Sequence, residues 1–167
     1  MPVKNPRELF VMTLSHVRQG TERGTKVFQE LSQAAQRQDV KEALEARVMV
    51  SKQILEKIDE CFRLIGEKPV QLTGRLEEVF LEDFRRELNE IQNPMAKHLF
   101  ILAKAVHLIH LRVGEYVALV AAADITGNHA VGALLETCLA DKLALAERTR
   151  RLIRYIAQNE IEQRKAA

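Results

Sequence analysis

The sequence predicts an all-α protein that forms one antiparallel bundle of four long helices plus one short helix. Three observations favour this fold. Hydrophobic residues make up 47% of the 167 residues and charged residues 29%, a balance typical of a folded chain. Apolar residues recur at alternating spacings of three and four over long stretches. The 7 Gly and 4 Pro residues are few, and several stand where one helix would give way to the next.

The first two helices have clear end signals. Asn5, Pro6 and Glu8 supply an N-cap, a first-turn proline and a carboxylate at the third helical position, so a helix is predicted to begin there. Its apolar stripe comprises Leu14, Val17, Thr21, Gly24, Phe28, Leu31 and Ala35. The second helix is predicted to run from Asp39 to a C-terminal cap at Gly66. Its stripe comprises Leu44, Val48, Ser51, Leu55, Ile58, Phe62 and Ile65.

The middle of the chain predicts a linker, the short helix and a strongly apolar helix. Residues 67–72, which include Pro69, form the linker, and residues 76–91 form the short helix. The fourth helix is predicted to begin at Pro94 and to end near Thr126. It is apolar on most of its circumference through Phe100, Leu102, Val106, Ile109, Val113, Val117 and Val120. We therefore expect several neighbouring helices to cover it.

The last helix follows a turn at Gly127 and Asn128 and is expected to fade into a flexible tail at about residues 160–167. Its predicted stripe comprises Leu134, Cys138, Asp141, Leu145, Arg148, Leu152 and Tyr155. Four helices of roughly 28 to 36 residues with short connections favour an antiparallel bundle, in which the short helix crosses or caps the others. A long coiled-coil dimer is the competing fold, but Gly and Pro interrupt the chain too often for it. Residues 1–167 are expected to form a single domain.

Composition and motifs exclude many function classes. The net charge of +2 does not require a nucleic acid or membrane partner. Cys61 and Cys138 form no spacing motif and suit a reducing compartment, so we expect a cytoplasmic protein. The first ten residues carry charges where a signal peptide needs an apolar core, and no run is long enough for a membrane span. The Walker loop and the G-x-G-x-x-G, G-x-S-x-G, H-E-x-x-H, C-x-x-C and E-x-x-H motifs are all missing.

A few residues remain as candidates for chemistry. Asp141 lies on the apolar stripe and needs either a metal or a salt-bridge partner at the stripe's edge; the sequence leaves both open. His107 and His110 are three residues apart and could chelate a metal, but a site needs three or four ligands, so a core or interface pair is the favoured interpretation. The arginines at 148, 150, 151 and 154 are interpreted as a solvated basic face, and nucleic acid binding is unlikely.

Several local strings resemble the YciE/YciF-type ferritin-like family, a bacterial group associated with stress responses. They are residues 5–10 leading into 13–15 and Glu22, residues 55–59, and Leu134-Leu135 before residues 139–142. The resemblance covers nearly the whole chain. It implies a ferritin-like five-helix bundle with a di-metal centre inside, and pairing as a homodimer.

The resemblance also implies where that centre would lie in this sequence. Carboxylates remain at Glu22, at Glu78 or Glu82, and at Asp141, whereas other ligand positions fall on Met49, Lys52, Ile109 and Arg112. His110 stands beside the last pair. We hypothesise a pseudo-site in which the cations of Lys52 and Arg112 replace the metals and form a buried salt-bridge network with the carboxylates. The alternative is that both cations lie on the bundle surface and that no site survives.

The predicted function is therefore that of a non-enzymatic, stress-associated or structural protein with a degenerate, metal-free centre. It would act through homodimerisation or a protein partner, using the surface of the fourth helix. The alternative is a di-iron or di-manganese oxidase, a catalase-like enzyme or an iron-handling protein. Its fallback metal ligands are Glu22, Glu78, Glu82, His107, His110 and Asp141.

Overall fold

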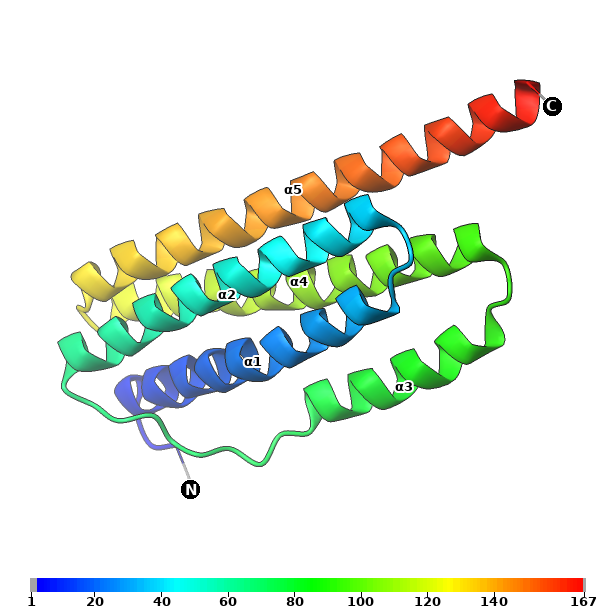
Figure 1. The fold of residues 1–167 in the computed structure, drawn as a ribbon. Coiled ribbons are helices and arrows are strands. Elements are labelled where there is room, and N and C mark those ends of the chain that lie inside the picture. The colour runs from blue at the N-terminus through cyan, green and yellow to red at the C-terminus, as the bar shows by residue number, and fades with distance from the viewer. Residues whose placement is uncertain (1–2, 167) are drawn as a thin grey trace.

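The computed structural model describes residues 3–166, apart from the side chains of Arg164 and Ala166. It contains five helices: α1 (Pro6–Ala34), α2 (Gln38–Ile65), α3 (Leu76–Glu90), α4 (Pro94–Ile125) and α5 (His129–Ala166). The four long helices lie side by side, and α3 packs on the outside against α1 and α4 (Figure 1). The predicted all-α antiparallel bundle is confirmed, with α3 as the short helix.

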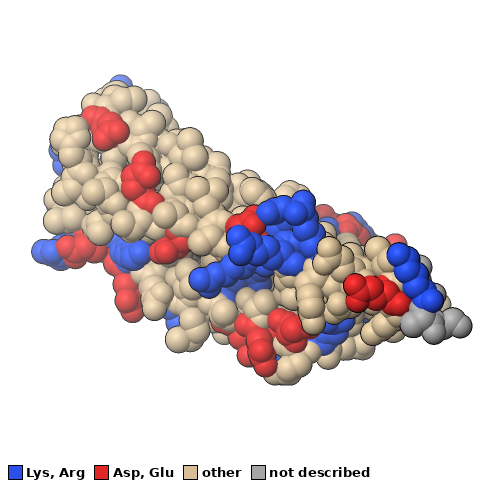
Figure 2. Space-filling model, turned by 90° about the horizontal axis from the view of Figure 1, so that it is seen from above, with Lys and Arg blue, Asp and Glu red and all other residues tan. Residues whose placement is uncertain are grey.

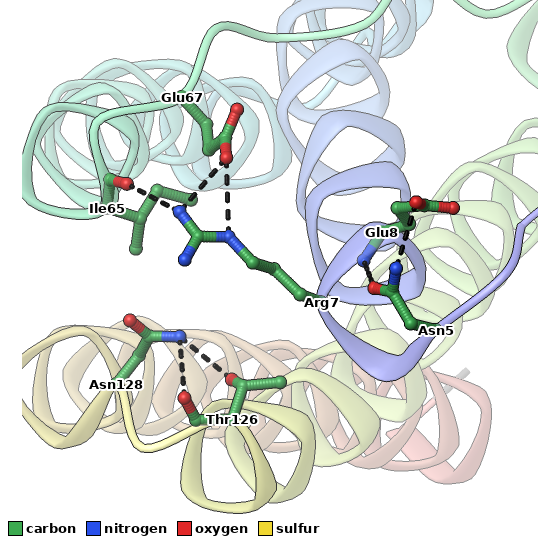
Figure 3. Close-up of polar contacts among 7 residues, drawn as sticks. All are labelled: Asn5, Arg7, Glu8, Ile65, Glu67, Thr126 and Asn128. Carbon is green, nitrogen blue, oxygen red and sulfur yellow. Dashed lines mark hydrogen bonds and ion pairs between the residues drawn. The ribbon is translucent and has the colours of Figure 1, made fainter.

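The helix ends follow from their local sequence. The Asn5 side chain accepts a hydrogen bond from the Glu8 amide at 2.9 Å, and the Glu8 carboxylate accepts one from the Asn5 side chain at 2.9 Å (Figure 3). The Asn93 side chain caps α4 by accepting a hydrogen bond from the Ala96 amide at 3.0 Å. Gly66 and Gly127 end α2 and α4 with positive φ angles of 69° and 73°, which non-glycine residues rarely adopt. The predicted boundaries of α1, α2 and α4 are confirmed to within one or two residues.

Two apolar clusters fill the bundle, one toward each end. The first contains Leu31, Leu44, Leu102 and Ile156 among its buried residues. The second contains Phe10, Ile58, Leu119 and Leu135 among its buried residues. Between them, at the middle of the long helices, lie buried polar residues on four helices. These residues, Thr21, Ser51, Arg112 and Lys142, are named the polar layer from here on.

The buried face of α5 differs from the predicted stripe. The buried positions are Val131, Leu135, Cys138, Lys142, Leu145, Thr149 and Ile156. Asp141 is half-buried, and Arg148 and Tyr155 are exposed. The true stripe passes through Lys142 and Thr149, which a hydropathy pattern does not mark as interior.

The C-terminal end of α5 is also corrected. The helix continues to Ala166, although a flexible tail was expected from about residue 160. Residues 160–166 contain neither Gly nor Pro and consist mainly of residues with high helix propensity. Only residue 167 of that predicted tail lies outside the part of the backbone that the structure describes.

Helix α4 is the core helix of the bundle. By length and composition it is the one described helix apolar enough to cross a membrane. It packs against α1, α2, α3 and α5, however, and the expectation that several neighbours cover it is confirmed. These contacts account for the apolar residues on its buried face, whereas an outward face between residues 103 and 121 stays exposed; a single apolar core helix of this kind is no evidence of a membrane span.

The segment between α2 and α3, residues 66–75, runs along α1 and is called the strap. Side chains of α1 hold it in register. The contacts join, in order, Arg7 to Glu67 and the Ile65 carbonyl, Ser15 to the Val70 amide, Gln19 to the Leu72 carbonyl, and Arg23 to the Gly74 carbonyl (Figure 3 shows the first). Four residues advance the helix by about 6.0 Å, and two residues advance an extended chain by about 6.6 Å. Contacts that are four residues apart on α1 therefore meet positions that are two residues apart on the strap.

Candidate functional site

The polar layer is the candidate site, because it places charged groups inside an otherwise apolar bundle. Arg112 of α4 is 5% exposed and Lys142 of α5 is 3% exposed. Glu77, at the start of α3, reaches the same region and is also buried. Long cationic and anionic side chains are almost never buried unless they are paired, so the partners of each one decide what the layer does.

Arg112 is held between two carboxylates. Its Nη2 donates to Oε1 of Glu77, and its Nη1 donates to Oε2 of Glu115 at 2.6 Å. Gly20 of α1 makes room for the guanidinium, since a Cβ at that position would overlap it. The arrangement therefore joins α1, α3 and α4 through one side chain.

A small cavity of about 270 Å³ lies outside this ion pair, between α1, the strap, α3 and α4. Arg112, Glu77 and Glu115 provide its charged wall. The other lining residues are His16, Gln19, Gly20, Arg23, Leu72, Gly74, Leu76 and Leu111. The volume is at the lower limit for a pocket that encloses a small molecule. Both carboxylates bind the one guanidinium of Arg112, which offsets half of their charge, and Arg23 in the lining supplies a second positive charge.

Lys142 is the second cation of the layer. No hydrogen bond or ion pair to its amine exists within the described part of the chain. Burial, and then the positive charge of Arg112, lower the pKa of Lys142 to about 8, although Cys138, Asp141 and Glu115 act in the opposite direction. The amine is thus a poorly solvated group whose charged form is disfavoured.

Two buried hydroxyl groups in this region are poorly hydrogen-bonded. The Thr21 hydroxyl lies close enough to that of Tyr116 to lower the pKa of Tyr116, but neither hydroxyl has a partner in good hydrogen-bond geometry among the described residues. Burial raises the pKa of Tyr116, so its hydroxyl stays protonated. Buried hydroxyls without partners are uncommon and costly. The centre of the bundle is therefore polar but incompletely hydrogen-bonded.

Arg47 of α2 is a third buried cation, about one turn from Ser51, and is 2% exposed. Its guanidinium donates to the Ala43 carbonyl at 2.7 Å and to the Thr149 hydroxyl, and its Nε has no partner. No described carboxylate pairs with it, and burial lowers its pKa to about 10. The contact with Thr149 ties α2 to α5.

The structure places only part of the predicted pseudo-site in the interior. Ile109 and Arg112 are buried, as expected of such a site, and Asp141 is half-buried. The exposed positions are Glu22, Met49, Lys52, Glu78 and Glu82. The expected network between Lys52 and interior carboxylates is therefore corrected. Lys52 follows the buried Ser51, and a step of one residue turns a helical side chain by about 100°, toward solvent.

The exposed carboxylates have surface partners. Glu22 lies 3.6 Å from Arg18, and Arg75 lies 2.9 Å from Glu78 and 3.5 Å from Glu82. These pairs are solvent-exposed and contribute little to stability. They do not converge with the polar layer.

Asp141 forms a salt bridge with Lys57 of α2 at 2.9 Å, which confirms the interpretation of a pair at the edge of the stripe. His107 and His110 are both exposed, so they are not a core pair. The His107 ring contacts Phe80 of α3 edge to face, with 6.1 Å between the ring centroids. Neither histidine belongs to the polar layer.

The side chains of the layer do not fit a di-metal centre. Within the described residues, no three His, Cys, Asp or Glu side chains come together to hold a metal ion. Glu77 and Glu115 are the nearest carboxylates, and both bind Arg112. Such centres require several carboxylate and imidazole donors facing one another, whereas here Arg112 and Lys142 stand in the interior.

The arginines of α5 at 148, 150, 151 and 154 are exposed. Lys and Arg side chains gather near the middle of the face seen in Figure 2, which does not identify them singly. Arg150 and Arg151 both bind Glu147, at 2.6 Å and 2.9 Å, and their hydrogen bonds, Arg150 first, lower the pKa of Glu147 to about 2. The charge of the arginines is thus partly neutralised within the helix, in keeping with a solvated face.

Sequence reasoning missed Glu77, Lys142, Arg47 and the role of Gly20. The available signal was helical phase. Lys142 lies four residues after Cys138 and three before Leu145, so it continues the buried face of α5. The Gly20 position, one turn before Gly24, could have indicated a close approach between helices.

With this geometry established, comparisons with known proteins place the chain in a family. The model of a family described as a domain of unknown function (DUF892) matches residues 5–164. The chain belongs to this family. A search among curated proteins finds no match. The resemblance to YciE/YciF-type proteins stated from the sequence is confirmed.

Solved structures show the same fold at low identity. The E. coli stress protein YciF aligns with a TM-score of 0.87 and 18% identity, covering 93% of this chain and 99% of that chain. YcfI of Rhodopseudomonas palustris, described as a proposed structural protein, aligns at 0.83 and 19%, covering 89% and 94%. A protein of Xanthomonas campestris pv. campestris aligns at 0.75 and 18%, covering 96% and 99%. The chain therefore has the YciF-like, ferritin-like fold.

Proposed function

We propose that this DUF892 protein is a non-enzymatic structural member of its family, in which a charge-balanced polar layer stands in place of a di-metal centre. The observation that carries the proposal is Arg112, buried between Glu77 and Glu115. A guanidinium at this place neutralises the carboxylates that a divalent cation would otherwise bind, and it repels such a cation. Lys142 adds a second positive charge to the same interior.

Metal analysis tests this proposal. The full-length protein, purified without chelators, should contain far less than one iron or manganese ion per chain. About two ions per chain, the stoichiometry of a bundle di-metal site, would overturn it. Because exposed His107 and His110 can bind metals adventitiously, the double variant H107A/H110A is the control. Metal that disappears in this variant does not belong to the interior.

We further propose that the protein acts through a second copy of itself. The outward face of α4 supports this, because its exposed residues between 103 and 121 include no Asp, Glu, Lys or Arg. They are Ala103, His107, His110, Leu111, Gly114, Val117, Ala118 and Ala121. A long, uncharged helical face suits the symmetric contact of a homodimer.

Sedimentation analysis of two matched variants tests the dimer. Val117 on α4 is 55% exposed, and Met49 on α2 is 60% exposed. The wild type and M49D should sediment as dimers, whereas V117D should sediment as a monomer, because it would bury a carboxylate in the contact. A monomeric wild type, or a V117D dimer, would rule out this face.

The proposed cellular setting rests on one similar structure and on the two cysteines. One similar structure is that of a stress protein, and both cysteines of this chain are free, as in a reducing compartment. We place the protein in the cytoplasm, in a supporting role during stress. Fractionation of the source cells tests the location. Comparison of a deletion strain with its parent under oxidative and osmotic stress tests the role in stress.

A further inference from the structure

The pairing of α2 with α5 brings the two cysteines of the chain to the same level of the bundle. Two contacts fix the antiparallel register: Arg47 with Thr149, and Lys57 with Asp141 at 2.9 Å. Cys61 lies one turn after Lys57 on α2. On α5, which runs the other way, one turn before Asp141 is the position of Cys138.

The side chains of both cysteines lie in the apolar core. Cys61 and Cys138 are each 0% exposed and belong to the same apolar cluster. Each is a free thiol. Burial, and then the charge of Cys138, raises the pKa of Cys61. The two thiols are therefore neighbours across the α2/α5 contact.

We propose that Cys61 and Cys138 are an oxidisable pair that forms a disulfide between α2 and α5 when the protein meets hydrogen peroxide. The proposal is independent of the function proposed above. In the first step, a thiolate attacks one peroxide oxygen, giving a sulfenic acid and, with a proton, water. In the second, the other thiol displaces the sulfenic hydroxyl as water. Two thiols and one peroxide thus give one disulfide and two waters.

The surroundings favour Cys138 as the thiol that reacts first. Lys57 and Lys142 lie near Cys138, and their charges oppose the effect of burial, which raises its pKa. Cys61 has no such neighbour, and burial raises its pKa to about 12. Cys138 is therefore the group that forms the sulfenic acid, and Cys61 is the group that resolves it.

Burial also sets the speed of the reaction. Thiolates are the reactive form, and both thiols are shielded, so peroxide reacts mainly in molecules whose α2/α5 contact has opened. The disulfide then restores and locks that contact. This disulfide, called the staple from here on, would form in molecules whose bundle has already opened under stress.

Mass spectrometry under denaturing, non-reducing conditions tests the staple. Reduced full-length protein is treated with hydrogen peroxide in dilute urea that loosens the fold without unfolding it. The expected product is monomeric, lighter by about 2 Da because two hydrogens leave, and gives a peptide linking residues 61 and 138. Cross-linked dimers alone, sulfinic or sulfonic acids without a linked peptide, or unmodified thiols would each overturn the proposal.

Single variants test the order of the steps. In C61A, dimedone should trap a sulfenic acid on Cys138, and in C138A the adduct on Cys61 should form several-fold more slowly. Equal rates would contradict the assignment of Cys138 as the first thiol. The oxidised wild type should also melt higher than the reduced protein by about 10 °C, because a long loop is closed. An unchanged or lower Tm would show that no stabilising staple forms.

Discussion

The guanidinium of Arg112 occupies the space that a side chain at Gly20 would fill. The Arg112 side chain of α4 is therefore buried in this position because residue 20 of α1 carries no Cβ. It also links the ion pair with Glu77 to helix packing, because the guanidinium that lies against Gly20 is the group that binds Glu77. The buried charge and the missing Cβ form a single structural unit.

Gly20→Ala should therefore destabilise the protein, by about 1–3 kcal/mol, because the added methyl overpacks a buried site. Gly24→Ala is the matched control. Its Cβ would meet only Leu108 at 4.0 Å, and an Ala inside a helix is about 0.5–1 kcal/mol more favourable than Gly. Urea unfolding should move the two variants in opposite directions. A stabilised G20A would show that Arg112 moves freely.

The Arg112 to Glu77 pair should behave as one unit in a double-variant cycle. Arg112→Met leaves Glu77 buried without a partner and should cost about 3–5 kcal/mol of unfolding free energy, whereas Glu77→Met leaves Arg112 paired with Glu115 and should cost less. The double variant R112M/E77M removes both charges and should recover most of that loss. The cycle is measured by urea unfolding. If the two single losses simply add, the residues do not interact across α3 and α4.

Lys142 should make stability depend on alkaline pH. Its pKa is about 8 in the folded protein, against 10.5 for an ordinary lysine, so between these values only the unfolded chain carries the proton. The unfolded state then binds more protons, and unfolding free energy should rise with pH across this window, by about 3 kcal/mol in total. Below pH 8 the full penalty of the buried charge is present.

Lys142→Met is the reference for this prediction, because thiols and tyrosine also titrate at alkaline pH. Their pKa values are raised by burial, which lowers stability over the same range. Only the difference in unfolding free energy between wild type and K142M therefore reports on the titration of Lys142. That difference should shrink from pH 8 to pH 10.5. A constant difference would mean that Lys142 keeps an ordinary pKa in the folded protein.

The strap should loosen when its contacts with α1 are removed. Ser15→Ala deletes the hydroxyl that accepts from the Val70 amide at 3.0 Å. We expect faster hydrogen exchange at the Val70 amide, by about a factor of 5 for the loss of 1 kcal/mol. Thr13→Ala is the control, since the Thr13 hydroxyl bonds only within its own helix, to the Leu9 carbonyl. Equal exchange at Val70 in both variants would contradict this role of Ser15.

The helices could be predicted from the sequence because their signals are local. Asn5, Pro94 and Gly66 act within a single helical turn, and the structure shows each in the expected role. The end of α5 was harder, because no residue between 160 and 166 marks a stop. The helix continues through these residues because they have high helix propensity.

The site could be predicted only to within one residue on most helices. The hypothesis chose Glu22, Lys52, Glu78 and Asp141, whereas the buried residues are their neighbours Thr21, Ser51, Glu77 and Lys142. Along a helix this error is a rotation of about 100°, which exchanges interior and solvent. A pattern of charges does not fix that rotation, because the three-dimensional packing of four helices sets it. Arg112 was located correctly because it lies within a long apolar helix.

The strap has a consequence for how this sequence can change over evolutionary time. Three of its contacts are made through the main chain, by the Val70 amide and the Leu72 and Gly74 carbonyls. Side-chain identity there is therefore under little constraint, whereas the number of residues is fixed by the spacing of Ser15, Gln19 and Arg23. Deleting one residue would place backbone amides opposite the donors of Gln19 and Arg23, which need carbonyls. It would also move Glu77 away from Arg112. Gly66 is held by its positive φ and Glu67 by its bond to Arg7, but in residues 68–75 substitutions should accumulate freely while insertions and deletions are rejected.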